Sequence, residues 1–184
     1  MRSLTRLLWL VGVIVITIPF AGSSAVHAQD ANPISTNLRA SWSNIRDLLT
    51  KMADEMPTEN YRFKPTPEIQ DFGQRMGHAI ITNMRACAML KGDPKTITLS
   101  AMPSKDEIVS AMKEANDECN SLMDSLTDAD VLKFVSARGG QRLELGVIEG
   151  MIEHSQENNG YLDVYLRIKG IVPPSSDRNE QRAR

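Results

Sequence analysis

Two polar residues near the C-terminal end of the sequence have the chemistry of ligands. His154 and Asn158 are four residues apart, so they lie on the same face of any helix that contains them. That face is otherwise largely apolar and also carries Tyr161 and Tyr165. A buried polar group without a partner costs about 1–3 kcal/mol, so the pair needs either a hydrogen bond in the core or a bound ligand. Imidazole suits zinc and nickel, whereas an amide oxygen suits harder cations such as calcium or manganese.

A third candidate, His78, comes from an earlier segment of the chain. With 3.6 residues per turn, His78 is about 160° from the core residue Ile80 around a helix. This spacing predicts that His78 faces solvent. It can join His154 in a site only if the polar face of its helix lines an open groove.

Composition excludes several classes of function. The 184 residues are 41% apolar and 24% charged, with a formal net charge of −2, as in an ordinary globular protein of one domain. No basic excess is present to hold a phosphate backbone, so we do not expect nucleic acid as a partner. Two cysteines cannot form a multi-thiolate zinc site.

The N-terminal residues have the pattern of an export signal. Arg2 and Arg6 precede the apolar run Leu7–Ile18, and Val26-His27-Ala28 offers small residues for cleavage. We therefore predict that residues 1–28 are a signal peptide and that the mature protein is periplasmic or secreted, with no membrane span. The alternative is an uncleaved membrane anchor, but the apolar run is shorter than the ~20 residues that a spanning helix needs.

The capping and helix-breaking residues, together with the helical spacing of apolar residues, predict four helices and no strands. The first helix is expected at about 36–56, the second from an N-cap at Thr66 to about Leu90, the third from a capping box at Ser104 to about Leu126, and the fourth over about 141–169. A short helical turn is expected from Thr127 to Phe134, a loop at 138–140, and a frayed charged tail at 177–184. The prediction is an all-α four-helix bundle, in which the long connection 92–103 allows a crossover.

The two cysteines, Cys87 and Cys119, lie on the apolar faces of the second and third predicted helices. In an oxidising compartment such a pair favours a disulfide. Two buried free thiols are the alternative, since cysteine is also a common small core residue. Either way the pair is interpreted as structural.

Two segments, 55–80 and 154–176, resemble the DinB-like family of metal-dependent four-helix-bundle proteins. The likeness covers about residues 35–176, and its motifs are specific as a set. They are Met56-Pro57, the Tyr-x-Phe-x-Pro-x-Pro pattern of Tyr61–Pro67, Phe72-Gly73, His78, His154, Gly160, Tyr165-Leu166-Arg167 and Gly170–Ser175.

The resemblance implies an up-down-down-up bundle over residues 29–176. Its members hold a divalent metal, usually zinc or nickel, with one histidine from the second helix and two from the fourth. Some are transferases or isomerases that use a thiol cosubstrate, and many have no known activity. Exported members with a cysteine on helices two and three support pairing of Cys87 with Cys119. Members often pair through helix faces, which would make a homodimer, although no exposed apolar stripe could be assigned here.

Carried over onto this sequence, the family's ligands become His78, His154 and Asn158, so the third histidine is missing. The remaining histidine, His27, lies in the predicted signal peptide. Glu157 points about 100° away from Asn158 on an ideal helix and could replace it only with distortion. A catalytic zinc normally has three protein ligands and a water, so two imidazoles and an amide should bind metal weakly.

The sequence therefore predicts an exported DinB-like bundle whose His/His/Asn site binds zinc or nickel weakly or is non-catalytic. Tyr161 and Tyr165 are expected to line its pocket, and the partner is an unidentified small molecule or protein. The alternative is a divalent-metal-dependent hydrolase or thiol S-transferase. No catalytic residue is assigned.

Overall fold

The computed structural model describes residues 31–137 and 139–177. The predicted signal peptide, 1–28, and residues 178–184 of the predicted tail lie outside the described residues. Within them, the elements are α1 (Pro33–Glu55), η1 (Thr58–Asn60), α2 (Phe72–Leu90), α3 (Lys105–Ser125), α4 (Asp128–Val131), β1 (Phe134–Ala137), β2 (Gly140–Leu143), α5 (Glu144–Ile168) and η2 (Pro174–Ser176).

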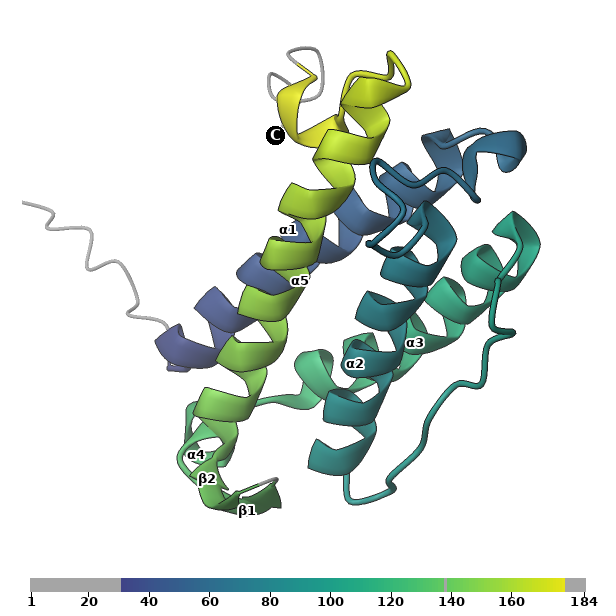
Figure 1. Ribbon diagram of the computed structural model, residues 1–184. Coiled ribbons are helices and arrows are strands. Elements are labelled where there is room, and N and C mark those ends of the chain that lie inside the picture. Colours follow the sequence, from purple (N-terminus) through teal and green to yellow (C-terminus); the bar gives the residue numbers. More distant parts are fainter. Residues whose placement is uncertain (1–30, 138, 178–184) are drawn as a thin grey trace, which may run out of the picture. The chain divides into compact units, whose positions relative to one another are not determined.

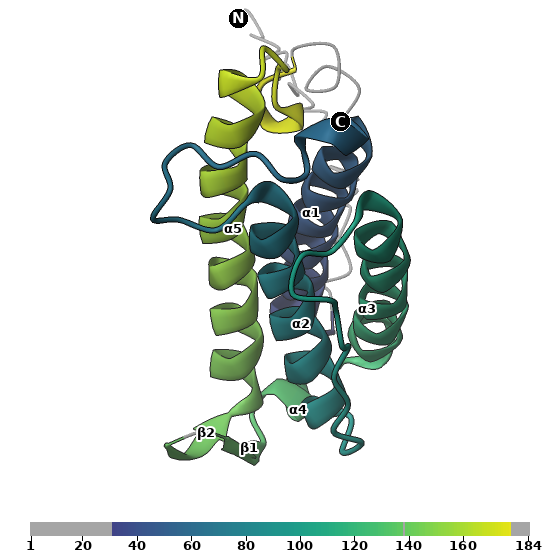
Figure 2. The ribbon, with the colours of Figure 1, turned by 45° about the vertical axis from the view of Figure 1, so that its right-hand side comes forward.

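The four long helices form a bundle. Helix α2 packs between α3 and α5, and α1 packs against the same two helices from the opposite side. Helices α1 and α5 run in one direction and α2 and α3 in the other (Figures 1 and 2). This is the predicted up-down-down-up order, and residues 91–104 make the long crossover that returns the chain from the end of α2 to the start of α3.

The core is built from the apolar faces that the sequence predicts. Large side chains with less than 2% exposure come from each of the four long helices or the turns beside them. Such periodicity positions each helix by burying one stripe and leaving the other face to solvent. None of the helices in the described ranges is long and apolar enough to cross a membrane. The core includes Trp42, Ile45, Met52, Tyr61, Phe72, Met76, Ile80, Ile108, Met123, Ile148, Leu162 and Leu166.

Helix α2 begins later than the sequence predicted. The proposed cap at Thr66 is wrong, because residues 66–70 are exposed and lie before the helix. The actual N-cap is Asp71, whose side chain accepts from the Gln74 N–H at 2.7 Å while the Gln74 side chain accepts from the Asp71 N–H at 3.1 Å. This reciprocal capping box fixes the start at the fully buried Phe72.

The prediction of no strands is also wrong. Strands β1 and β2 form an antiparallel hairpin in which Val135 pairs with Arg142 and Ala137 with Gly140. Gly139 and Gly140 have φ of 96° and 124°, a conformation that favours glycine and ends any helical path. The last long helix therefore begins at Glu144, not at Gln141, and the hairpin lies at the end of the bundle where α5 starts (Figure 1).

Two further contacts tie the helices together. The Sγ atoms of Cys87 and Cys119 are at disulfide-bond distance, 1.98 Å, which links α2 to α3. The Asp128 carboxylate accepts from the backbone N–H groups of Ile34 and Ser35 at 3.2 and 2.8 Å, so the start of α4 caps the start of α1. Asn32 completes this contact by accepting from the Asp128 N–H at 2.9 Å.

Candidate site between helices α2 and α5

The two histidines meet across the groove between α2 and α5. Their Nε2 atoms are 3.0 Å apart and their rings are nearly perpendicular, at 82°. His78 is exposed, as its position on the polar face predicted, and the His154 side chain is 28% exposed. The polar face of α2 therefore does line an open groove, which was the condition for the two residues to share a site.

Glu157 orients His154 from the other side of the ring. Its Oε2 atom is 3.3 Å from His154 Nδ1, one turn along α5. A carboxylate only accepts hydrogen bonds, so this contact favours the form of His154 that carries a proton on Nδ1. The two Nε2 atoms are within hydrogen-bond distance, and which of them donates depends on the tautomers of the two rings. Glu157 thus orients the His154 ring and does not take the place of Asn158 as a third ligand.

The environment of His78 favours its neutral form. Burial lowers the pKa of His78 below its usual value, and electrostatic interaction with His154 and with Arg75 lowers that pKa further, against a smaller opposing effect of Glu157. A neutral imidazole retains a lone pair, which is the state that binds metals or accepts a proton.

Asn158 does not join the histidine pair. Its side chain is fully buried, and its Nδ2 donates to the His154 carbonyl oxygen at 2.7 Å within the same helix. Its Oδ1 atom is buried without a hydrogen-bond partner among the described residues. The amide nitrogen of Asn158 is thus satisfied by the backbone of its own helix, whereas its amide oxygen is unsatisfied.

This donor set does not fit the three-ligand metal site that the family resemblance implies. Two ligand nitrogens on a tetrahedral zinc are separated by roughly 3.3 Å, so His78 and His154 are close to the required spacing. However, no group of three or more His, Cys, Asp or Glu side chains in 31–137 and 139–177 is arranged to hold a metal ion. The site falls one ligand short.

The groove has a cavity on one side of the histidine pair, lined by both predicted pocket tyrosines. Its volume is about 400 Å³, and Arg75 stacks over the Tyr161 ring with its guanidinium carbon 4.2 Å from the ring centroid. The Tyr165 hydroxyl donates to the Gln70 carbonyl oxygen at 2.6 Å, and burial raises the pKa of this phenol. Tyr165 is thus occupied by the backbone, whereas Tyr161 is exposed.

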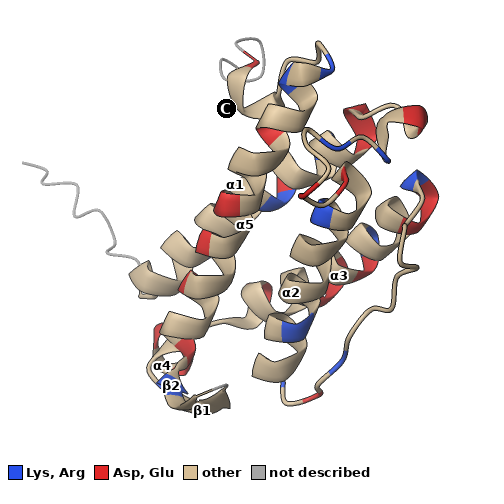
Figure 3. Ribbon diagram, in the orientation of Figure 1, with Lys and Arg blue, Asp and Glu red and all other residues tan. Residues whose placement is uncertain are grey.

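A larger cavity of about 550 Å³ includes both histidines. Arg85 of α2 and Arg142 of β2 line it, together with Thr82 and a set of apolar residues from α2 and α5. Basic positions are coloured blue on the ribbons of α2 and β2 in Figure 3. The predicted site did not include either arginine.

These arginines were missed for a structural reason. Arg142 belongs to the hairpin, and the sequence pattern placed it inside the fourth helix. Arg85 lies on the polar face of the second predicted helix, and nothing in its local pattern distinguishes it from a solvent-exposed arginine. The run Arg138-Gly139-Gly140 was the available signal, since paired glycines between short polar and apolar segments are typical of a hairpin turn.

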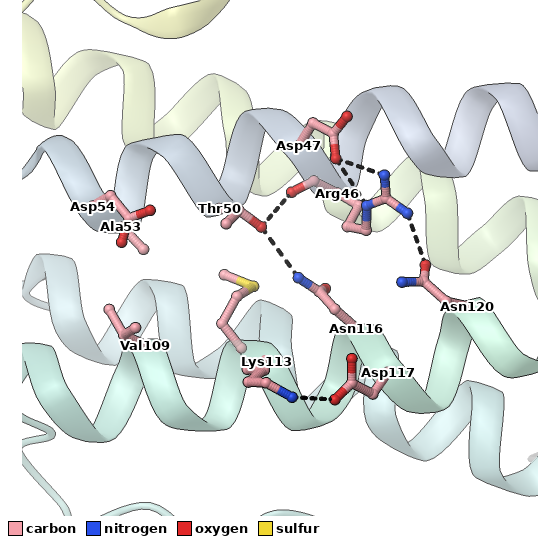
Figure 4. A pocket seen from close by; sticks show the side chains of 11 residues that line it. Arg46, Asp47, Thr50, Ala53, Asp54, Val109, Lys113, Asn116, Asp117 and Asn120 are labelled. Atoms are coloured by element: carbon pink, nitrogen blue, oxygen red, sulfur yellow. Dashed lines mark hydrogen bonds and ion pairs between the residues drawn. The ribbon is translucent and has the colours of Figure 1, made fainter.

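A further cavity lies between α1 and α3, and the polar side chains that line it hydrogen-bond to one another. It has a volume of about 290 Å³, and Figure 4 shows its side chains. Arg46 donates to Asp47 and to Asn120, each at 2.8 Å, and Asn116 donates to the Thr50 hydroxyl at 3.1 Å. These groups satisfy one another and stabilise the contact between the two helices.

Comparison with known proteins agrees with this architecture. The family model of the DinB superfamily matches residues 40–162. A DinB-like protein from Bacillus subtilis is 16% identical with a TM-score of 0.62, over 73% of this chain and 92% of that chain. A DinB-like protein from Bacillus cereus is 19% identical with a TM-score of 0.63, over 76% and 95%. No curated protein matches the sequence. The bundle, the matched family model and the shared fold together show that this chain belongs to the DinB superfamily.

Proposed function

We propose that this DinB-superfamily bundle is a binding protein whose α2–α5 site holds a divalent transition metal only weakly, and that it does not perform metal-dependent catalysis. One observation carries the proposal. His78 and His154 are paired at 3.0 Å, while the residue at the third ligand position is an amide bonded to its own helix.

The chemistry of the pair supports weak and reversible metal binding. Zinc or nickel could take the two Nε2 atoms once the proton between them is displaced. Glu157 would still orient His154, as carboxylates commonly do for metal-bound imidazoles. With only two protein ligands, the metal would depend on water or a bound molecule for the rest of its coordination, so its affinity would be low.

Export is part of the same proposal. It is supported by the signal-like pattern of residues 1–28 and by the paired cysteines, which persist in an oxidising compartment. Known thiol cosubstrates of the family are cytosolic, and an exported chain would not meet them. This favours binding over the alternative of a thiol S-transferase.

The test is metal content and affinity of the protein purified without chelator or tag, by elemental analysis and by titration with zinc, nickel and manganese. We expect substoichiometric metal in the wild type and weak binding that is lost in His78→Ala and His154→Ala. Asn158→His should tighten zinc binding about 100-fold, because each ligand of a four-ligand zinc site contributes about 3 kcal/mol.

Gln156→His is the matched control, because it adds an imidazole to an exposed position on a different face of the same helix. Its zinc affinity should equal that of the wild type. Stoichiometric metal in the wild type, lost in either histidine variant, would overturn the proposal and favour the metal-dependent hydrolase or transferase.

A further inference from the structure

The larger cavity of the α2–α5 groove has an unusual balance of charge. The protein as a whole has more acidic than basic residues, 23 against 21. Yet none of the described residues that line this cavity is an aspartate or a glutamate, whereas Arg85, Arg142 and both histidines do line it. The cavity is thus a local region of positive charge in an acidic protein, which favours an anion.

Both arginines keep donors available for a ligand. Arg85 uses Nε to donate to the Thr96 hydroxyl at 3.0 Å, and Arg142 uses Nη2 to donate to the Gly146 carbonyl oxygen at 3.2 Å. Among the described residues, each bond leaves other guanidinium N–H groups unused. Neither arginine forms an ion pair within the described part of the chain, in contrast to Arg46 in the cavity between α1 and α3. These bonds hold the side chains in place without neutralising them.

Much of the remaining lining of the same cavity is apolar. It includes Met89 and Ala86 of α2 and Val147, Gly150 and Met151 of α5, and all five are at least partly buried. Methionine side chains adapt to ligands of different shape. A volume of about 550 Å³ lies within the roughly 300–1,000 Å³ typical of small-molecule sites.

From this arrangement we infer that the cavity between α2, α5 and the β1–β2 hairpin binds an amphipathic carboxylate, with Arg85 and Arg142 on the carboxylate and the apolar lining on its apolar chain. Guanidinium groups match a carboxylate because their planar N–H pairs can donate to both oxygens. A small inorganic anion would leave the apolar lining uncovered.

This inference does not rest on the proposed metal site. Its test is therefore done with the full protein in the presence of a chelator, so that failure to bind metal and failure to bind the carboxylate are distinguishable. The probe is octanoate, titrated by calorimetry, with chemical shifts of α2 and α5 amides as a second readout. We expect saturable binding at one site, and weaker binding of acetate.

Variants of the arginines identify the site. Arg85→Gln and Arg142→Gln should each weaken octanoate binding about tenfold, as expected for loss of a hydrogen bond to a charged group. Both side chains are exposed, so the fold should survive these changes. Arg167→Gln is the matched control, since this exposed arginine of α5 donates to Ser176 and does not line the cavity. It should bind octanoate as the wild type does.

Three results would overturn the inference. One is the absence of saturable octanoate binding at millimolar concentration. Another is equal binding of octan-1-ol, which has the same chain without the charge. The last is inorganic phosphate binding as tightly as octanoate, because the apolar lining would then contribute nothing.

Discussion

At the scale of single residues, the polar groups in and beside the α2–α5 groove differ in how they are satisfied. Tyr165 and Asn158 each donate to a backbone carbonyl oxygen, at 2.6 and 2.7 Å. Within the described ranges, Arg85 and Arg142 retain unused donors, and His78 and His154 contact each other, with Glu157 beside His154. A ligand would therefore meet the histidines and arginines first, and these are the residues on which both proposals depend.

Asp163 provides a test of burial at this scale. Its Oδ2 accepts from the Ser175 hydroxyl at 2.9 Å, while Oδ1 is buried without a hydrogen-bond partner in the described ranges. Burial raises the pKa of this carboxyl, and the Ser175 hydrogen bond and Arg167 only partly oppose the shift. The folded protein thus binds the Asp163 proton more tightly than the unfolded chain does. The free energy of unfolding therefore falls as pH rises through the folded-state pKa of this carboxyl, because the buried group then becomes charged.

We predict that Asp163→Asn raises the melting temperature at pH 7, because the amide keeps an acceptor for Ser175 without a buried charge. At pH 3, where the wild-type carboxyl is protonated, the two proteins should melt together. Thermal unfolding by circular dichroism at both pH values measures this. Asp124→Asn, at an exposed position of α3, should show no such pH-dependent gain. A lower melting temperature of Asp163→Asn at pH 7 would contradict the assignment.

At the scale of elements, the helix boundaries are decided by capping side chains. The capping box at Ser104 was predictable, because Ser and Glu occur at the required spacing within three residues, and it starts α3 as expected. The start of α2 was mispredicted because Thr66-Pro67 offered an equally good local signal. Burial of Phe72 and its N–H bond to the Phe63 carbonyl oxygen at 3.1 Å select Asp71 instead, and neither contact can be seen in a local pattern.

The cap that Asp128 provides for α1 comes from 93 residues away in the sequence. We predict that Asp128→Ala lowers the free energy of unfolding by about 1–2 kcal/mol, since the first N–H groups of α1 lose their acceptor. Asp128→Asn keeps one acceptor oxygen and should lose less. Urea unfolding at neutral pH measures the difference, with Asp124→Ala as the control for loss of a like charge. Equal stability of Asp128→Ala and the wild type would show that water replaces this cap.

At the scale of the whole molecule, the bundle was predictable and the groove was only partly so. Apolar residues at helical spacing fix which faces meet, so the helix count and the core follow from the sequence. The meeting of His78 with His154 required knowledge of which helices are neighbours, which came from the family resemblance. The position of Arg142 was missed because the strands of its hairpin carry no alternating apolar pattern, and the paired glycines at 139–140 were the only local signal of the turn.

The link between α2 and α3 affects the stability of the whole bundle. Cys87 and Cys119 close a loop of 32 residues, and both side chains are fully buried. We predict that the double variant Cys87→Ala/Cys119→Ala loses about 3–4 kcal/mol of unfolding free energy by the chain-entropy estimate. Urea unfolding of both proteins measures the loss.

The proposal of export has its own test. The mass of the protein purified from its producing cell should correspond to a chain that begins at residue 29 and contains the disulfide.

The same cross-link has a consequence for proteolysis. The crossover 91–104 lies entirely within the ring that the two cysteines close, and it exposes Lys91 and Lys95 to a trypsin-like protease. A single cut after either lysine breaks the backbone, yet the two fragments stay covalently joined through the sulfurs. The nicked molecule would keep its mass, apart from one added water, and would migrate as one band until a reductant separated the halves. An apparently intact chain on a non-reducing gel is therefore no measure of how well this segment resists cleavage.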